Sequence, residues 1–167
     1  MGRLDSEPMI STSQVKRYFE QNHASRDAAA PLKKGVQIAI TVLQANGTED
    51  AYIFERVITG NSLVEAPPGA VANTDLSFKV PARTMAELIN YQVEEIGEIG
   101  VFILRKMMGT TAPEDRIYFK VHCGVLRLMK NGYLGVLAAG GKSVASFLAH
   151  NGISLSSIKS VLQKFKA

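Results

Sequence analysis

The apolar residues in the first half of the chain predict one helix followed by three strands. They recur at helical spacing over residues 12–21, behind a serine that suits a cap position. Residues 36–43 and 51–60 are rich in strand-forming side chains, and the Asn-Gly pair at 46–47 favours a hairpin turn between them. Residues 75–80 alternate between apolar and polar, which predicts a third strand. The residues of this strand expected to face inward are Leu76, Phe78 and Val80.

The middle of the chain predicts a helical crossover. Residues 61–70, which include two adjacent prolines, are expected to lead away from the strands. Pro81 ends the third strand and suits the first turn of a helix. From residue 84 to residue 108 the apolar side chains recur at helical spacing. Gly97 and Gly100 favour a break in this pattern, so two helices are expected.

The second half of the chain predicts further strands and then helices. Residues 115–129 have strand character, and the Asn-Gly pair at 131–132 suits a second hairpin turn before a strand at 133–137. A short helix follows and ends at the Asn-Gly pair at 151–152. Residues 153–167 then carry an apolar stripe opposite lysines, which predicts an amphipathic C-terminal helix.

This order of elements predicts an α+β (mixed α/β) fold with one mixed sheet and helices mainly on one face. We expect a single domain over residues 1–167, which is long enough to bury one core. Within it, residues 1–30 form an N-terminal helix and loop, residues 31–152 form the sheet and the crossover helices, and residues 153–167 form the C-terminal helix.

Composition and charge narrow the possible environments and partners. The chain has one cysteine, so no intrachain disulfide is possible, and its N-terminus carries acids and lacks an apolar run. A cytoplasmic location is therefore expected. The formal net charge of +4 is mildly basic, and a nucleic-acid platform would need aromatic residues interleaved with lysine and arginine along a sheet face. The segment RIYFKV at 116–121 hints at such interleaving but stands alone. We therefore expect no nucleic-acid partner, although the basic C-terminal helix could touch an anionic membrane surface.

A glycine-rich stretch, Gly135–Gly152, raises the question of a phosphate-binding loop. Such a loop needs a glycine six positions before Lys142, and that position is Val136. The stretch is therefore interpreted as a turn, at Gly140-Gly141, that leads from the last strand into a helix.

Candidate catalytic and metal-binding residues are few. The three histidines are scattered, and His122 and Cys123 are neighbours expected to point to opposite faces of a strand, so no metal site and no cofactor is predicted. Cys123 lies between apolar residues, as a small buried hydrophobe does. Glu94 and Glu98 share a helix face directed toward solvent. We expect a protein without catalysis, and an enzyme that uses Cys123 or His122 is the less favoured alternative.

The order of segments resembles the sterol carrier protein type 2 family, the non-specific lipid-transfer domain, in its prokaryotic form. The resemblance is carried by three segments, "GVQIAITVLQANGTEDAYIFERVITGNSLVEAP", "ANTDLSFKVPARTMAELINY" and "EDRIYFKVHCGVLRLMKNGYLGVLAAGGKSVASFLAHNG". It covers about residues 30–152 and lies in order and pattern, because the family has no catalytic signature. The chain lacks the peroxisomal tail of eukaryotic members and has a longer crossover.

The resemblance implies a five-stranded sheet covered on one side by helices that enclose an apolar tunnel. The implied function is binding or intracellular transfer of a hydrophobic lipid, such as a fatty acyl chain, acyl-CoA, sterol-like or isoprenoid lipid. Apolar residues of the crossover and the following helix would wall the tunnel. These candidate ligand-binding residues are Met85, Leu88, Ile89, Val93, Ile96, Phe102, Ile103, Met107, Met108 and Phe147. Core packing explains the same apolar residues about equally well.

The alternative function is an accessory subunit of a lipid-modifying pathway, with the same fold and a closed pocket. The C-terminal helix and an exposed Met107–Met108 region would then be docking surfaces.

Overall fold

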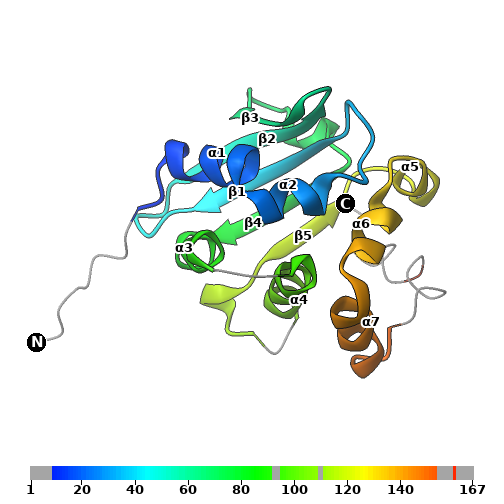
Figure 1. The fold of residues 1–167 in the computed structure, drawn as a ribbon. Coiled ribbons are helices and arrows are strands. Elements are labelled where there is room, and N and C mark those ends of the chain that lie inside the picture. Colours follow the sequence, from blue (N-terminus) through cyan, green and yellow to red (C-terminus); the bar gives the residue numbers. More distant parts are fainter. Residues whose placement is uncertain (1–8, 92–94, 109–110, 154–159, 161–167) are drawn as a thin grey trace, which may run out of the picture.

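A five-stranded mixed sheet forms the centre of the computed structural model, which describes residues 9–91, 95–108, 111–153 and 160 (Figure 1). The strands run in the order β3-β2-β1-β4-β5. Their bounds are Gln37–Leu43 (β1), Glu49–Val57 (β2), Gly60–Glu65 (β3), Leu76–Pro81 (β4) and Tyr118–Val121 (β5). β1 pairs with β4 in parallel, and every other pairing is antiparallel. The predicted α+β fold with one mixed sheet is confirmed.

One face of the sheet is covered by the first four helices (Figure 1). These helices are α1 (Thr12–Gln21), α2 (His23–Ala29), α3 (Ala82–Asn90) and α4 (Ile96–Met107). The register places Ile40 of β1 beside Tyr52 of β2 and Phe78 of β4. Since alternate residues of a strand share a face, the apolar positions of all three strands meet the helices on this side. The core therefore lies between α1–α4 and the sheet.

The other three helices form a group beside α2 and α4 (Figure 1). They are α5 (Val125–Lys130), α6 (Tyr133–Ala139) and α7 (Gly141–His150). Two short 3-10 helices, Val71–Asn73 and Pro113–Asp115, lie in the connections before β4 and β5.

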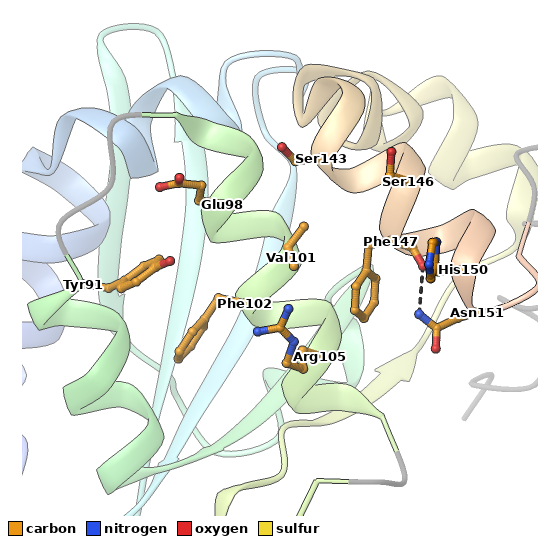
Figure 2. A pocket seen from close by; sticks show the side chains of 10 residues that line it. All are labelled: Tyr91, Glu98, Val101, Phe102, Arg105, Ser143, Ser146, Phe147, His150 and Asn151. Atoms are coloured by element: carbon orange, nitrogen blue, oxygen red, sulfur yellow. Dashed lines mark hydrogen bonds between the residues drawn. The ribbon is translucent and has the colours of Figure 1, made fainter.

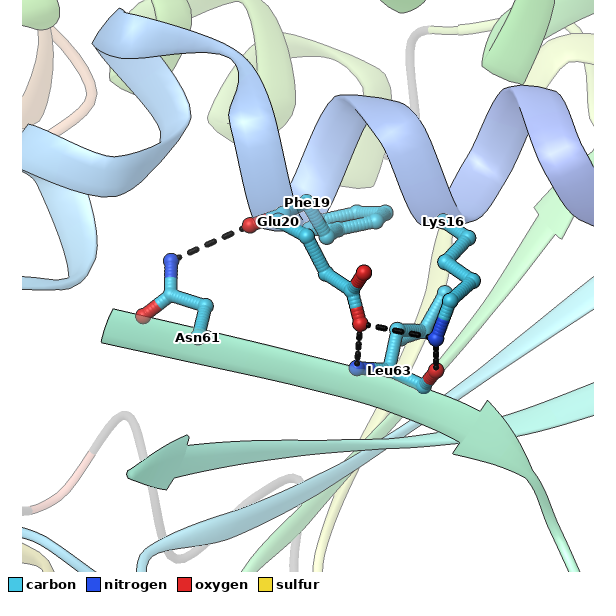
Figure 3. A network of polar contacts seen from close by, with 5 residues as sticks. All are labelled: Lys16, Phe19, Glu20, Asn61 and Leu63. Atoms are coloured by element: carbon cyan, nitrogen blue, oxygen red, sulfur yellow. Dashed lines mark hydrogen bonds and ion pairs between the residues drawn. The ribbon is translucent and has the colours of Figure 1, made fainter. Parts of the chain in front are cut away.

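Side chains of α1 cover the free edge of the sheet at β3 (Figure 3). The Leu63 N–H donates to Glu20 Oε2 at 2.9 Å, and Lys16 Nζ donates to the Leu63 carbonyl at 2.9 Å. Asn61 Nδ2 donates to the Phe19 carbonyl at 3.1 Å. An edge strand leaves backbone groups without sheet partners, and the two contacts to Leu63 satisfy such groups, while all three contacts dock the helix. They hold Tyr18 and Phe19 above the sheet.

A buried carboxylate ties α5 and α6 to the start of β4. Asp75 is 2% exposed, forms an ion pair with Arg127 Nε at 2.9 Å, and accepts hydrogen bonds from Asn131 Nδ2 at 2.6 Å and the Tyr133 hydroxyl at 3.2 Å. Burial, and then the neighbouring Asp75 charge, raise the pKa of Tyr133, so this hydroxyl stays a neutral donor. The cluster fixes the position of α6 relative to the sheet.

The crossover is divided into two helices as predicted, but the glycines play a different part. The break follows Asn90 of α3, whereas Gly97 and Gly100 lie inside α4. A Cβ at Gly97 would collide with the Gly140 carbonyl oxygen, and a Cβ at Gly100 would lie 2.8 Å from Val144 Cγ2. Both glycines therefore allow α4 to approach α7 closely.

Two predictions about the strands were wrong. Residues 61–70 do not simply lead away from the sheet, because Gly60–Glu65 returns along β2 as β3. The predicted strand at 115–129 is reduced to β5, and Val125–Lys130 forms α5 with Leu128 buried. An apolar run of this length fits either a short strand or a turn of helix, so periodicity alone did not separate them.

The predicted second hairpin is also wrong, since the Asn-Gly pair at 131–132 joins two helices. Gly132 has a φ of 92° and leads directly into α6, where a strand was expected. A Cβ there would collide with the Pro31 carbonyl oxygen, so the turn needs glycine for space and for its backbone angle. The Gly140-Gly141 turn consequently joins α6 to α7 and does not follow a strand.

The predicted helix before residues 151–152 is present as α7, and Gly152 ends it with a φ of 72°. The predicted C-terminal helix over 153–167 falls almost wholly outside the described residues. No helix within the described ranges has both the length and the apolar character needed to cross a membrane.

Candidate functional site

An apolar cavity of about 190 Å³ lies between the sheet and the helices that cover it. Its floor is formed by apolar residues of β1, β2 and β4, and its roof by residues of α1–α4 and α6, with contributions from the loops before β1 and β5. The floor residues are Ile38, Ile40, Phe54, Phe78 and Val80. The other lining residues are Tyr18, Phe19, Ser25, Ala28, Ala29, Leu32, Met85, Leu88, Ile99, Ile103, Ile117 and Val136. We call this space the inner cavity.

The lining of the inner cavity has almost no polar character. Among its residues only Tyr18 and Ser25 carry a side-chain nitrogen or oxygen, and none carries a formal charge. Transfer of an apolar group from water into such a space is favourable by about 0.8 kcal/mol of free energy per CH₂ group. A charged group that enters it loses hydration without meeting an opposite charge. The inner cavity is therefore suited to uncharged, mainly apolar matter.

Tyr18 lines the inner cavity, but its buried hydroxyl oxygen contributes almost nothing to the cavity surface. Tyr18 is 5% exposed, and its Oη has no hydrogen-bond partner within the part of the chain that the structure describes. Burial raises the pKa of Tyr18 to about 12, because the phenolate form would lose its hydration. The hydroxyl therefore remains protonated at neutral pH and able to donate.

Three of the ten residues predicted from the sequence line the inner cavity, namely Met85, Leu88 and Ile103. Ile89 and Met107 pack against the core without lining the cavity. Four others lie elsewhere: Phe102 and Phe147 line a groove on the other side of α4, and Ile96 and Met108 are half-buried and line neither space. Val93 falls outside the described residues.

The groove lies between α4 and α7 and has a volume of about 690 Å³ (Figure 2). We call it the outer groove. Tyr91 and Phe102 stack in it with ring centroids 5.6 Å apart, and the Arg105 guanidinium lies 5.9 Å from the Phe147 ring centroid. Its remaining lining residues are Glu98, Val101, Ser143, Ser146, His150 and Asn151.

Helix α4 separates the two spaces. Ile99 and Ile103 face the inner cavity, whereas Val101 and Arg105 line the outer groove. The carboxylate Glu98, which sequence analysis directed toward solvent, is exposed on the groove side. Exposed charged and polar groups keep much of their hydration. The outer groove therefore differs from the inner cavity in chemistry as well as in size.

Sequence reasoning missed the contribution of the first two helices to the inner cavity. Val15, Tyr18 and Phe19 share a helical face, but nothing in that pattern shows whether the face meets solid core or empty space. Helix α2 is short and alanine-rich, and its wall residues Ala28 and Ala29 leave room by being small. Only the three-dimensional arrangement reveals this space.

The residues considered for catalysis lie away from both spaces. His122 Nε2 lies 2.7 Å from Ser77 Oγ, on the sheet face opposite the core residues, and Cys123 packs near Leu76, Val121 and Leu128. Among the described residues no group of three or more histidine, cysteine, aspartate or glutamate side chains is placed to hold a metal ion. The proposed Met107–Met108 docking surface is not an exposed patch, since both side chains are half-buried.

Comparisons of the chain with protein-family models, with curated proteins and with solved structures found no match.

Proposed function

We propose that the protein binds a hydrophobic ligand in the inner cavity without catalysis, as a carrier or a presenting protein. The observation that carries this proposal is the uncharged, apolar lining of a space that lies between the sheet and its covering helices. An empty apolar cavity in a domain core forfeits packing contacts, and a hydrophobic ligand restores them.

The volume of the cavity limits the part of a ligand that it accepts without rearrangement. Its 190 Å³ exceeds the apolar cavities of about 150 Å³ that hold a benzene ring. It is smaller than the range of about 300–1,000 Å³ that is usual for pockets of drug-sized molecules. A ring-sized or short-chain group fits the cavity as it stands, and a long acyl chain would need α4 or α2 to move outward.

The resemblance to sterol carrier proteins supports the lipid as a ligand class. That resemblance implies a sheet covered on one side by helices, with the ligand between them, and the inner cavity likewise lies between the sheet and its covering helices. The proposal includes a cytoplasmic location and contact of the basic residues 153–167 with anionic membrane surfaces during loading or release.

Two matched tryptophan variants test whether binding occurs in the inner cavity. Ile103→Trp places a large ring in the cavity, whereas Val101→Trp places the same ring on the groove side of the same helix. Purified proteins would be titrated with a small apolar probe, α-methylstyrene, and followed by NMR chemical shifts. The proposal expects saturable binding to the unmodified protein and to Val101→Trp, and loss of binding in Ile103→Trp.

Thermal unfolding of the same variants shows whether the added ring has been accommodated. Ile103→Trp should lose little stability if the ring fills an existing space, while overpacking a filled core costs about 1–3 kcal/mol. Failure of the unmodified protein to bind any apolar probe would overturn the proposed function.

An accessory subunit of a lipid-modifying pathway is the second candidate. The small volume of the inner cavity favours this second candidate. An accessory subunit with a closed pocket would have a cavity too small for a whole lipid, as this protein does. Native mass spectrometry of protein purified from lipid-bearing cells separates the two functions. A co-purifying hydrophobic molecule supports the carrier, and a stable protein partner together with an empty cavity supports the accessory subunit.

A further inference from the structure

The charged residues are divided unevenly along the chain. All 15 aspartates and glutamates lie within residues 1–115, whereas residues 116–167 hold eight of the 19 lysines and arginines and no acid. The formal charge of this C-terminal part is therefore +8, although that of the whole chain is only +4. Such an asymmetry is typical of a region that meets an anionic partner, and the helices α5–α7 belong to it.

Helix α5 is anchored to the fold by one apolar side chain and leaves two others in water. Leu128 is 2% exposed and packs with Leu76 and Val121. Leu126 and Met129 are three positions apart, and therefore on one side of the helix, and they are 73% and 51% exposed. Single exposed apolar side chains need no explanation, whereas apolar side chains that gather on one face mark an interaction surface.

Backbone hydrogen bonds bring the loop before β1 and the tip of the β2–β3 hairpin to the same end of the molecule. The Lys33 N–H donates to the carbonyl of Asn131, directly after α5, at 3.0 Å, and the Gly35 N–H donates to the Arg56 carbonyl at 2.8 Å. Two residues beyond Arg56, at the hairpin tip, Ile58 is 80% exposed. We call this end the α5 surface, and its exposed residues are Lys33, Lys34, Ile58, Leu126, Met129 and Lys130.

The acidic side chains near the α5 surface do not neutralise it. Asp75 is buried and paired with Arg127. Glu55 is half-buried on β2, where Gln37 Nε2 donates to its Oε1 at 3.3 Å. The three lysines of the α5 surface form no ion pair within the part of the chain that the structure describes. The surface therefore combines positive charge with exposed apolar side chains.

We propose that the α5 surface docks the protein on a lipid bilayer that contains anionic phospholipids. The apolar side chains of α5 and the hairpin tip enter the boundary of the acyl chains, and the lysines meet the negative head groups. This inference goes beyond the proposed function, because docking does not require a ligand in the inner cavity. It also concerns a different surface from residues 153–167.

The exposed apolar side chains favour a bilayer over a nucleic acid. A nucleic acid offers the same negative charge, but its phosphates would leave Leu126 and Met129 in contact with water. A bilayer offers negative head groups and an apolar layer within one interface. Lysine side chains suit this boundary, because the stem covers apolar surface while the ammonium stays among the head groups.

Two walls of the inner cavity belong to segments that carry or adjoin the α5 surface. Leu32, which lines the cavity, directly precedes Lys33, and Val136 lines it from α6, the helix that follows α5. A protein docked through this end holds these two walls close to the bilayer. Docking would therefore serve the loading or release of a hydrophobic ligand.

Two pairs of matched variants test the proposal. Met129→Ser removes an apolar side chain from the α5 surface, and its control Met9→Ser removes the same side chain, 56% exposed, beside Asn46 in the β1–β2 turn. Lys130→Gln removes one positive charge from the surface, and its control Lys79→Gln removes one near the opposite end of the sheet. Arg127 is left unchanged because of its pairing with Asp75.

Each full-length protein would be sedimented with vesicles of phosphatidylcholine and phosphatidylserine in about a three-to-one ratio, and with vesicles of phosphatidylcholine alone. The unmodified protein should bind the mixed vesicles, more weakly at high salt, and should not bind the neutral ones. Met129→Ser and Lys130→Gln should each lower the partition coefficient by about threefold to tenfold. The two control variants should keep it within about twofold.

A second readout shows that the variants are folded and keeps the two proposals apart. None of the four substituted residues lines the inner cavity, so all four variants should bind α-methylstyrene as the unmodified protein does. Their melting temperatures should also stay close to that of the unmodified protein, since exposed side chains contribute little to stability.

The other outcomes overturn the docking surface. If the unmodified protein ignores the mixed vesicles, or if the surface and control variants lose binding equally, the inference fails and the hydrophobic site stands. Vesicle binding that neither Met129→Ser nor Lys130→Gln weakens would place the membrane contact elsewhere, such as in residues 153–167. Binding of single-stranded RNA that Lys130→Gln weakens, in a protein that ignores vesicles, would assign the surface to a nucleic acid.

Discussion

The two sides of helix α4 face spaces of opposite character. The inner cavity is the smaller, at about 190 Å³, and its walls are apolar, whereas the outer groove has about 690 Å³ and is lined by charged, hydroxyl and aromatic side chains. In the groove a ligand competes with water for every polar group. In the cavity, apolar contact acts with little competition from water. The ligand site that we propose is therefore the smaller of the two spaces, selected by its lining and not by its size.

Truncating one wall residue of each space should give the largest contrast in stability. Met85 is fully buried in α3 and lines the inner cavity, so Met85→Ala should lower the free energy of unfolding by about 2–5 kcal/mol. Val101 is half-buried on the groove side, so Val101→Ala should cost less than about 1 kcal/mol. Urea denaturation of the two variants measures both values.

Met85→Ala also enlarges the inner cavity and should allow larger apolar probes to bind. If Met85→Ala lowered the free energy of unfolding by less than Val101→Ala does, α3 would not form part of the core. The contrast between the two sides of α4 would then fail.

The glycines of α4 should show how rigidly the helix is held against α7. Gly97→Ala places a methyl group against the Gly140 carbonyl oxygen, which belongs to the backbone and cannot rotate away. Gly100→Ala meets only Val144 Cγ2, which can shift. Each substitution gains about 1 kcal/mol in helix propensity. We expect net destabilisation of about 1–2 kcal/mol for Gly97→Ala and almost none for Gly100→Ala.

This pair changes the contact between α4 and α7 without touching the lining of the inner cavity. Binding of α-methylstyrene to the folded Gly97→Ala protein should therefore keep its affinity within about twofold, since no wall residue has changed. Stabilisation by Gly97→Ala in thermal unfolding would show that α4 and α7 are not in close contact.

The smallest expected effect is the loss of stability at low pH when Glu20, which docks α1 onto β3, becomes protonated. Burial alone would raise the pKa of Glu20, but the Leu63 N–H and the Lys16 ammonium outweigh it and lower the pKa below its ordinary value of 4.5. Since the folded-state pKa is lowered, Glu20 stabilises the fold above pH 4.5 and loses this contribution as the pH falls through the folded-state value.

Glu20→Gln should accordingly flatten the acid side of the curve of stability against pH, with little change in its shape near neutrality. Curves for the two proteins that stay parallel down to the acid transition would contradict the assignment. Such a result would also weaken the argument that this edge contact holds Tyr18 in the cavity wall.

The parts of the fold that sequence patterns predicted are those with a strong period and clear terminal signals. The helix at 12–21 has both a capping serine and an apolar face, and β1 and β4 are alternating or β-branched runs bounded by turns. The misassigned parts are short. A six-residue apolar run such as Val125–Lys130 contains too few turns for its period to show, and tertiary contacts, here through Asp75, decide its form.

The candidate site was predictable in composition but not in place. Met85, Leu88 and Ile103 were selected for their helical spacing, and the inward-facing residues of β4 followed from alternation. The same spacing also selected Phe102 and Phe147, which line the other side of α4. The Tyr18 hydroxyl has no hydrogen-bond partner among the residues that the structure describes, and no sequence pattern records such an absence.

The most direct test of the account is to map where a neutral apolar probe binds. Backbone NMR shifts would be recorded during a titration of the unmodified protein with α-methylstyrene. The account predicts saturable shifts centred on residues of the cavity wall, such as Tyr18, Ile40 and Ile103, with the far end of α7 unaffected. Shifts centred on Val101 and Phe147 of the outer groove, or no saturable shifts at all, would contradict it.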